Sequence, residues 1–186
     1  MKNDSKTETT AGDVALKART GNASPAENLP DLQPGDILLY GGRDLVSRLI
    51  QFRTWSDVSH VEIHVGGGFS VASRNGHGVG RYPLRTQGLR RVYRPHGFMG
   101  APAFDFDAAM RWFATVDKTP YGWADLLRFY LIDIPTKGLI CSEFGDLWFR
   151  NGRLPLFNIY YPEGAVCPGD YEKISSLLVV QIWSWK

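Results

Sequence analysis

An alternating stretch near the middle of the first half of the chain reads Ser59-His60-Val61-Glu62-Ile63-His64-Val65. From His60 onward polar and apolar residues alternate strictly, which is the period of a β-strand with one buried face. The pattern therefore predicts a strand with His60, Glu62 and His64 on one face and three β-branched residues on the other. Three glycines follow at 66–68, which predicts a hairpin turn, and residues 69–73 fit the returning strand.

Further elements are predicted on both sides of this hairpin. Short apolar runs bounded by turn residues predict strands at residues 37–40, 79–84 and 89–93. Apolar residues at helical spacing predict helices at 45–52 (behind an Asp44 cap), 106–113, 123–131 and 140–149. Because most strands precede most helices, we expect an α+β fold in which a small antiparallel sheet packs on a helical layer.

Composition narrows the class of protein without naming a function. The 186 residues are 44% hydrophobic and 22% charged with a formal net charge of +2, which gives no general electrostatic reason to expect a nucleic-acid partner. No apolar stretch approaches the ~20 residues of a membrane span, so we expect no integral membrane association. Residues 1–28 are polar and predict a disordered leader before a domain at 29–186. The absence of an apolar signal segment and the two cysteines favour the cytoplasm, and a phage-encoded or phage-delivered protein also fits.

Two residues carry the chemistry that the sequence predicts. Cys141 begins a predicted helix, where the helix dipole and free backbone N–H groups stabilise a thiolate and can hold an oxyanion. His60, at the start of the alternating strand, is a candidate general base for that thiol. The alternatives are a buried structural cysteine and a surface histidine. Cys167 lies in a loop-like stretch and is interpreted as structural or incidental.

Other polar residues allow different interpretations. His60, Glu62 and His64 on one strand face, with His77 nearby, are residue types that hold zinc or iron. A second hypothesis concerns five arginines on neighbouring strands, which either line a cleft for an acidic partner or form solvated strand faces. They are Arg81, Arg85, Arg90, Arg91 and Arg94. Trp55, Trp112, Trp123 and Trp148 are expected in the core.

Taken together, several motifs resemble the NlpC-like papain-fold peptidases in circularly permuted form, and most of all the permuted amidases of the YiiX/YaeF type. The motifs are Leu32-Gln33-Pro34-Gly35-Asp36-Ile37-Leu38, then residues 59–66, then Pro120-Tyr121-Gly122-Trp123, then Ile140-Cys141-Ser142-Glu143-Phe144. The order, with the histidine strand first and the cysteine helix last, is that of the permuted form. The resemblance spans roughly residues 30–175 and implies a permuted papain-like fold with Cys141 as nucleophile, His60 as base and Tyr121 beside the cysteine.

The resemblance also shows one departure from the family pattern. A third polar residue, which orients the histidine, lies about twelve positions after it in the family, and that position here is Ala72. An alanine cannot fix the tautomer of an imidazole. Glu62, His64 or Ser73 are the available substitutes, and Glu62 is preferred. A Cys–His dyad or a loss of activity are the other outcomes.

The function implied is a cysteine-dependent hydrolase that cleaves a peptide or amide bond, with cell-wall peptide as one candidate substrate. The reaction would pass through an acyl-thioester on Cys141 and would need no cofactor or metal. Two alternatives remain open at this stage. One is a non-catalytic binding or structural module of the same fold, and the other is a lipid acyltransferase or thioesterase that uses the same pair of residues.

Overall fold

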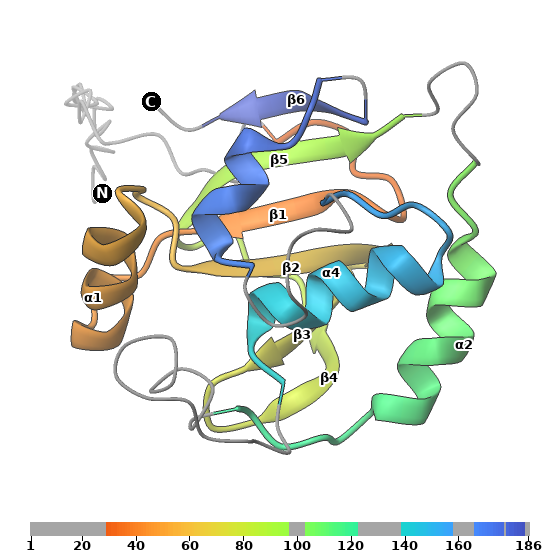
Figure 1. The fold of residues 1–186 in the computed structure, drawn as a ribbon, viewed down its shortest axis with the longest axis horizontal. Helices are drawn as coiled ribbons and strands as arrows, with labels where there is room; N and C mark the ends of the chain where they lie inside the picture. Colours follow the sequence, from red (N-terminus) through yellow and green to blue (C-terminus); the bar gives the residue numbers. More distant parts are fainter. Residues whose placement is uncertain (1–28, 97–102, 123–138, 158–165, 177, 185–186) are drawn as a thin grey trace, which may run out of the picture.

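The computed structural model describes residues 29–96, 103–122, 139–157, 166–176 and 178–184. The predicted leader at 1–28 and the predicted helix at 123–131 lie outside the described residues. Within them the fold is α+β, as the sequence predicted: one antiparallel sheet with helices against it (Figure 1). No helix in the described ranges is long and apolar enough to cross a membrane.

The sheet has six antiparallel strands in the order β4-β3-β2-β1-β5-β6. The strands are β1 (Ile37–Tyr40), β2 (His60–Gly66), β3 (Phe69–Arg74), β4 (Gly78–Pro83), β5 (Leu89–Pro95) and β6 (Val179–Ser184). The alternating stretch forms β2, which lies in the interior of the sheet between β1 and β3. The hairpin from β2 to β3 turns through glycines with positive φ, a conformation that side chains with a Cβ rarely adopt.

In the described residues, three α-helices and a 3-10 helix lie around the sheet. They are α1 (Leu45–Thr54), α2 (Phe106–Val116), α4 (Cys141–Asn151) and the 3-10 helix η2 (Pro168–Lys173). Asp44 caps α1 as predicted, because its side chain accepts a hydrogen bond from the backbone N–H of Ser47 at 2.9 Å. Figure 1 shows α4 lying across one face of the sheet with α2 beside it, and α1 at the opposite end of the molecule.

The alternation of β2 divides the interior into two parts. Val61 and Ile63 point to the main core, where they join Phe144, Trp148 and other residues of the helical layer. The other face of the sheet carries a smaller apolar cluster built on Leu38, Tyr40, Leu89 and Val92. Glu62 pairs with Leu38 in the register of β1 and β2, so its carboxylate is buried on this second face.

The tryptophans differ from one another more than the sequence suggested. Trp148 is fully buried and packs against the rings of Phe104 and Phe106, and Trp112 packs on Phe144. Trp55 was expected in the core, and this expectation was wrong, because its side chain is 90% exposed. It follows the last residue of α1 in a left-handed conformation that turns the chain away from the helix.

Replacement of Gly145 by alanine should lower the free energy of unfolding, although alanine is the better helix former. A Cβ at this position would overlap the hydroxyl oxygen of Tyr171 and lie 3.2 Å from its Cζ atom. Tyr171 cannot move freely, because it is fully buried and donates a hydrogen bond of 2.9 Å to the carbonyl of Ser142. Overpacking typically costs about 1–3 kcal/mol, which outweighs the ~1 kcal/mol gained from helix propensity.

Urea unfolding followed by circular dichroism measures this difference. Arg111→Ala, at an exposed position of α2, is the control and should change the free energy of unfolding by less than about 0.5 kcal/mol. A Gly145→Ala protein as stable as the wild type would contradict the packing of α4 against Tyr171.

Candidate active site

Cys141 is the first residue of α4, and contacts on both sides fix its position. Ile140 is the N-cap residue and provides no side-chain cap, so the first backbone N–H groups of the helix remain available to the sulfur. Ser73 of β3 donates a hydrogen bond of 2.5 Å to the carbonyl of Leu139, just before the helix. Leu139 also forms an isolated β-bridge with Tyr121, so Tyr121 lies beside the start of α4.

His60 is the first residue of β2, at the end of the sheet nearest the start of α4. Its Nε2 atom lies 3.1 Å from Oε1 of Glu62, and the imidazole also hydrogen-bonds to the side chain of Cys141. Because Nε2 is taken by the carboxylate, Nδ1 is the nitrogen left for the sulfur. The structure therefore brings together Cys141, His60 and Glu62 in one continuous chain of contacts.

The electrostatics of the pair favour a thiolate and an imidazolium. Burial opposes the charged form of His60, but the adjacent Cys141 thiolate and the Glu62 carboxylate outweigh it and raise the pKa of His60 to about 9. Burial likewise opposes the thiolate of Cys141. The imidazolium, with backbone N–H groups at Val61 and Ser142, nevertheless lowers the pKa of Cys141 below that of an ordinary thiol.

Glu62 is held by four side chains although its own side chain is completely buried. Arg74 of β3 binds both carboxylate oxygens, with Nε to Oε1 at 3.0 Å and Nη2 to Oε2 at 2.8 Å. Arg85 adds a contact of 3.1 Å from Nη2 to Oε1, and the hydroxyl of Ser70 donates to Oε2. Burial would raise the pKa of Glu62, but the hydrogen bond and charge of His60, with hydrogen bonds from Arg74 and Ser70, hold that pKa well below its usual range.

The register of β2 and β3 also places Ala72, the position at which the resemblance led us to expect a polar residue. One step along the β2–β3 register from the pair Ile63 and Val71 places Ala72 opposite Glu62. The methyl group of Ala72 leaves room for Ser70 and Arg74, which flank it on the same strand, to reach the carboxylate. Of the predicted substitutes, only Glu62 contacts His60. Ser73 bonds Leu139 instead, and His64 is buried beside Asp36.

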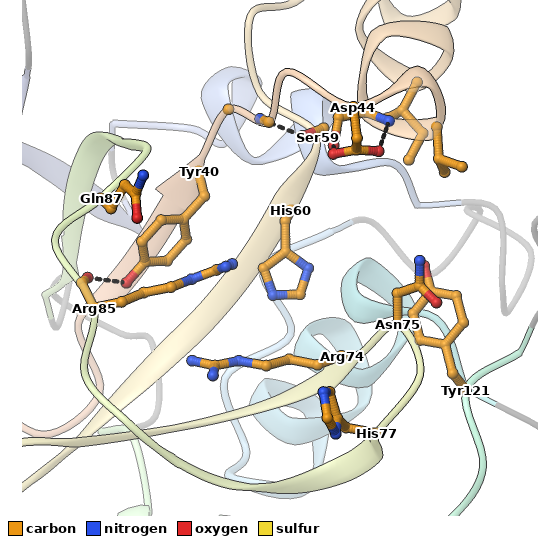
Figure 2. A pocket seen from close by; sticks show the side chains of 15 residues that line it. Tyr40, Asp44, Ser59, His60, Arg74, Asn75, His77, Arg85, Gln87 and Tyr121 are labelled. Carbon is orange, nitrogen blue, oxygen red and sulfur yellow. Dashed lines mark hydrogen bonds between the residues drawn. The ribbon is translucent and has the colours of Figure 1, made fainter.

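A pocket of about 390 Å³ opens beside His60. Figure 2 shows His60 at its centre, with Tyr40 and Arg85 on one side and Asn75 and Tyr121 on the other. The Arg74 side chain runs below the imidazole, and the Arg85 guanidinium approaches it from the side of Tyr40. Cys141 is only 3% exposed and is not among the lining residues, whereas its partner His60 is.

The cluster of five arginines does not form a common cleft. Only Arg85 lines the pocket. Arg91 and Arg94 are paired with acidic partners, Arg91 with Asp57 and Glu172 and Arg94 with Asp36. Arg81 lies over the ring of Phe69, and Arg90 lies 4.0 Å from Asp57. Of these four, Arg81 is exposed while the other three are only partly exposed, so the alternative of solvated strand faces describes Arg81 alone.

The residues proposed for a metal site do not converge either. Arg74 and Arg85 cover the oxygens of Glu62, and the nearest charge to His64 comes from Asp36. Among the described residues, no three histidine, cysteine, aspartate or glutamate side chains are grouped to hold a metal ion. His77 lines the pocket and packs edge-on against Tyr82.

Sequence reasoning missed Arg74, Ser70 and Tyr40 as parts of the site. Tyr40 lies opposite His60 in β1 and lines the pocket, where the Arg85 guanidinium lies 4.5 Å from its ring centre. The four-residue spacing of Ser70 and Arg74 on one strand face was the available signal, and using it required the hairpin register.

No protein-family model matches this chain, and no curated protein sequence matches it either.

The two cysteines should differ sharply in their reaction with iodoacetamide. The lowered pKa of Cys141 predicts alkylation at pH 6–7, where an ordinary thiol with a pKa of ~8.5 is mostly protonated. Burial and the Asp170 carboxylate raise the pKa of Cys167 to about 12, so this residue should stay unmodified below pH 10. Mass spectrometry of peptides containing each cysteine, sampled against pH, gives both profiles in one experiment.

The His60→Ala variant tests the physical cause of this difference. Without the imidazolium, burial is the dominant influence on the Cys141 thiol, so its alkylation profile should move to higher pH than that of an ordinary thiol. The Cys167 profile serves as the internal control and should not move. A Cys141 profile that is the same in wild type and His60→Ala would contradict the ion pair.

Proposed function

We propose that this protein is a cysteine-dependent hydrolase that cleaves a peptide or amide bond through an acyl-thioester on Cys141. The observation that carries the proposal is the linked set Cys141, His60 and Glu62, in which a nucleophile, a base and an orienting carboxylate are already in contact. His60 and Glu62 lie on β2, and Cys141 begins α4, which is distant in the sequence. Together they supply the nucleophile, the base and the orienting carboxylate that acyl transfer requires.

Each residue has a defined part in the proposed reaction. The Cys141 thiolate attacks the substrate carbonyl, a C–S bond forms, and the backbone N–H groups at the start of α4 hold the oxyanion. His60 then donates its proton to the leaving amine as the C–N bond breaks. Water, deprotonated by His60, attacks the thioester, which releases the acid and restores the ion pair. Tyr121, beside the start of α4, faces the pocket where the substrate binds.

Glu62 is proposed to keep the imidazole in position throughout these steps. Its carboxylate accepts from Nε2 and so directs Nδ1 to the sulfur, the role of the third member of a catalytic triad. Because Arg74 and Arg85 hold the carboxylate ionised, Glu62 does not take the proton from His60. Glu62 thus replaces the polar residue that is missing at Ala72, which weakens the case for a non-catalytic module.

The resemblance to permuted papain-like amidases supports the same proposal. The strand with the base comes first, the helix with the nucleophile comes last, and the helix start lies against the end of the base strand. We interpret the six-stranded sheet with α4 across one face as the permuted papain-like arrangement.

The pocket indicates the chemistry of the substrate. Its lining is mostly polar and includes two cations, Arg74 below the imidazole and Arg85 beside it. The Arg85 side chain is 44% exposed and uses one nitrogen for Glu62, which leaves donors directed at the pocket. This favours a peptide amide with a carboxylate near the cleaved bond, a class that includes cell-wall peptides. A lipid acyl chain requires an apolar groove, which this lining does not provide.

Turnover of fluorogenic peptide amides, with an acidic or a neutral residue next to the cleaved bond, tests the proposal. Cys141→Ala should abolish turnover, and His60→Ala should lower kcat on the order of 10²–10⁴-fold. Acid-quenched wild-type protein should carry the acyl group on Cys141, which intact-mass spectrometry detects. Cys167→Ala is the matched control and should retain activity. A folded wild-type protein that forms no adduct with amide or ester substrates would instead support the binding module.

The Glu62→Gln variant separates positioning of His60 from general stability. The amide keeps the shape of the side chain but leaves Arg74 and Arg85 without a counter-charge, which lowers the pKa of His60 and disfavours the thiolate. We expect kcat/KM to fall on the order of 10²-fold and its alkaline limb, which reports loss of the His60 proton, to move to lower pH.

Ser70→Ala is the matched control for this change. It removes a neutral hydrogen bond to the same carboxylate but no charge, so it should cost less than about tenfold in kcat/KM and leave the pH profile in place. Thermal unfolding of both variants reports any loss of folded protein. Equal pH profiles for Glu62→Gln and wild type would remove Glu62 from the proposed mechanism.

A further inference from the structure

The outer face of α1 carries a row of large apolar side chains that contact solvent. Leu45 is 83% exposed, Leu49 49%, Phe52 73% and Trp55 90%. The first three recur at the four- and three-residue spacing of a single helix face. The rings of Phe52 and Trp55 lie side by side, with centroids 6.1 Å apart. Exposed apolar patches rimmed by polar residues mark interaction surfaces in water-soluble proteins.

The inner face of the same helix is already used by the fold. Ile50 is buried against Ile140, with Val46 and Tyr121 packed beside them. The side chain of Gln51 donates to the carbonyls of Gly42 and Asp57, which ties α1 to the loops at both of its ends. The helix is therefore fixed on the molecule, and its exposed outer face is not the result of detachment.

Positive charge accompanies this apolar row. Arg43, Arg48 and Arg53 are all exposed and are spaced along the same segment. None of them forms an ion pair with another residue of the described part of the chain. The one acidic residue at this helix, Asp44, is occupied as the N-cap. Apolar aromatic side chains between unpaired arginines are the composition of helices that lie in the interface of an anionic bilayer.

We propose that the outer face of α1, defined by Leu45, Leu49, Phe52 and Trp55 with Arg43, Arg48 and Arg53, docks on an anionic phospholipid membrane. The apolar side chains enter the boundary between headgroups and acyl chains, while the arginines bind lipid phosphates. With ten residues, α1 lies along the surface and does not cross the bilayer. A second copy of the chain is a poorer occupant, because a two-fold contact would place these arginines against their own copies.

Docking through this face also sets the position of the pocket. Asp44, Val46, Ser47 and Ile50 of the α1 segment line the pocket beside His60, on the side of the helix that faces the protein. A protein held by the outer face of α1 therefore presents the pocket close to the membrane surface. The proposed docking is independent of turnover. In the described part of the chain, no residue of the docking face forms a hydrogen bond, an ion pair or a ring contact with Cys141, His60 or Glu62.

Co-sedimentation of the full chain with vesicles tests the proposal. At 50 mM salt the protein should bind vesicles of phosphatidylcholine with 30% phosphatidylserine, bind pure phosphatidylcholine at least about tenfold more weakly, and lose most binding at 500 mM salt. Phe52→Ser with Trp55→Ser, and separately Arg48→Gln with Arg53→Gln, should each weaken binding at least about tenfold. Both pairs are at exposed positions, and circular dichroism of each variant checks that it is folded.

The matched control is Arg111→Gln with Arg153→Gln, which removes the same charge from exposed positions of α2 and the segment after α4. This pair should bind the anionic vesicles like the wild type. Brominated lipids supply a direct readout of insertion. They should quench a component of wild-type tryptophan fluorescence that is missing in Trp55→Phe, while that variant still sediments with the vesicles.

Three outcomes would overturn the proposal. One is equal loss of vesicle binding in the α1 arginine pair and in the control pair, which would indicate unspecific attraction. Another is a wild-type dimer in light scattering that Phe52→Ser with Trp55→Ser converts to a monomer, which would assign the face to a second copy. The third is protection of the Trp55 fluorescence from acrylamide quenching when no vesicles are present. This result would show that another segment of the same chain covers the face.

Discussion

The buried negative charge of Glu62 is the constraint on which the rest of the site depends. A carboxylate with no exposed surface is stable only when its oxygens are fully paired, and removal of one partner from such a group typically costs about 3–5 kcal/mol. The partners come from β3 and from the segment after β4, so the register of the hairpin and the return of the chain must both be correct for the charge to be neutralised. One side chain thus couples the arrangement of three strands to the orientation of His60.

The strict alternation of β2 lets one strand serve two environments. Val61 and Ile63 complete the core beneath α4, while Glu62 lies on the opposite face with its cations. His60 belongs to the Glu62 face but stands at the end of the strand, where the side chain can also meet the start of α4. His64, four residues further along on the same face of β2, is instead buried within the sheet.

The parts of the fold that depend on local pattern were predictable from the sequence. The period of β2, the Asp44 cap of α1 and the order of strands and helices follow from spacing and turn residues. Arg74 and Ser70 were missed because their role depends on which residues face Glu62 across β3, and a shift of one residue reverses every side chain. The exposure of Trp55 was missed because α1 is apolar on both faces: Val46 and Ile50 recur as regularly as Leu45 and Leu49, and only tertiary packing selects the inner pair.

The two faces of α1 connect the proposed chemistry with the proposed location, and they do so through different residues. The inner face holds the loop of Gly41 and Gly42 and one wall of the pocket, so it determines what can approach His60. The outer face touches no part of the catalytic set, so selection for packing does not explain its aromatic residues and arginines. A purely structural helix at the rim of a pocket needs only the inner face. Four neighbouring apolar side chains gain nothing from burial in the folded protein, and transfer from water to another surface would be favourable, which is why we propose a partner for the outer face whether or not Cys141 is chemically reactive.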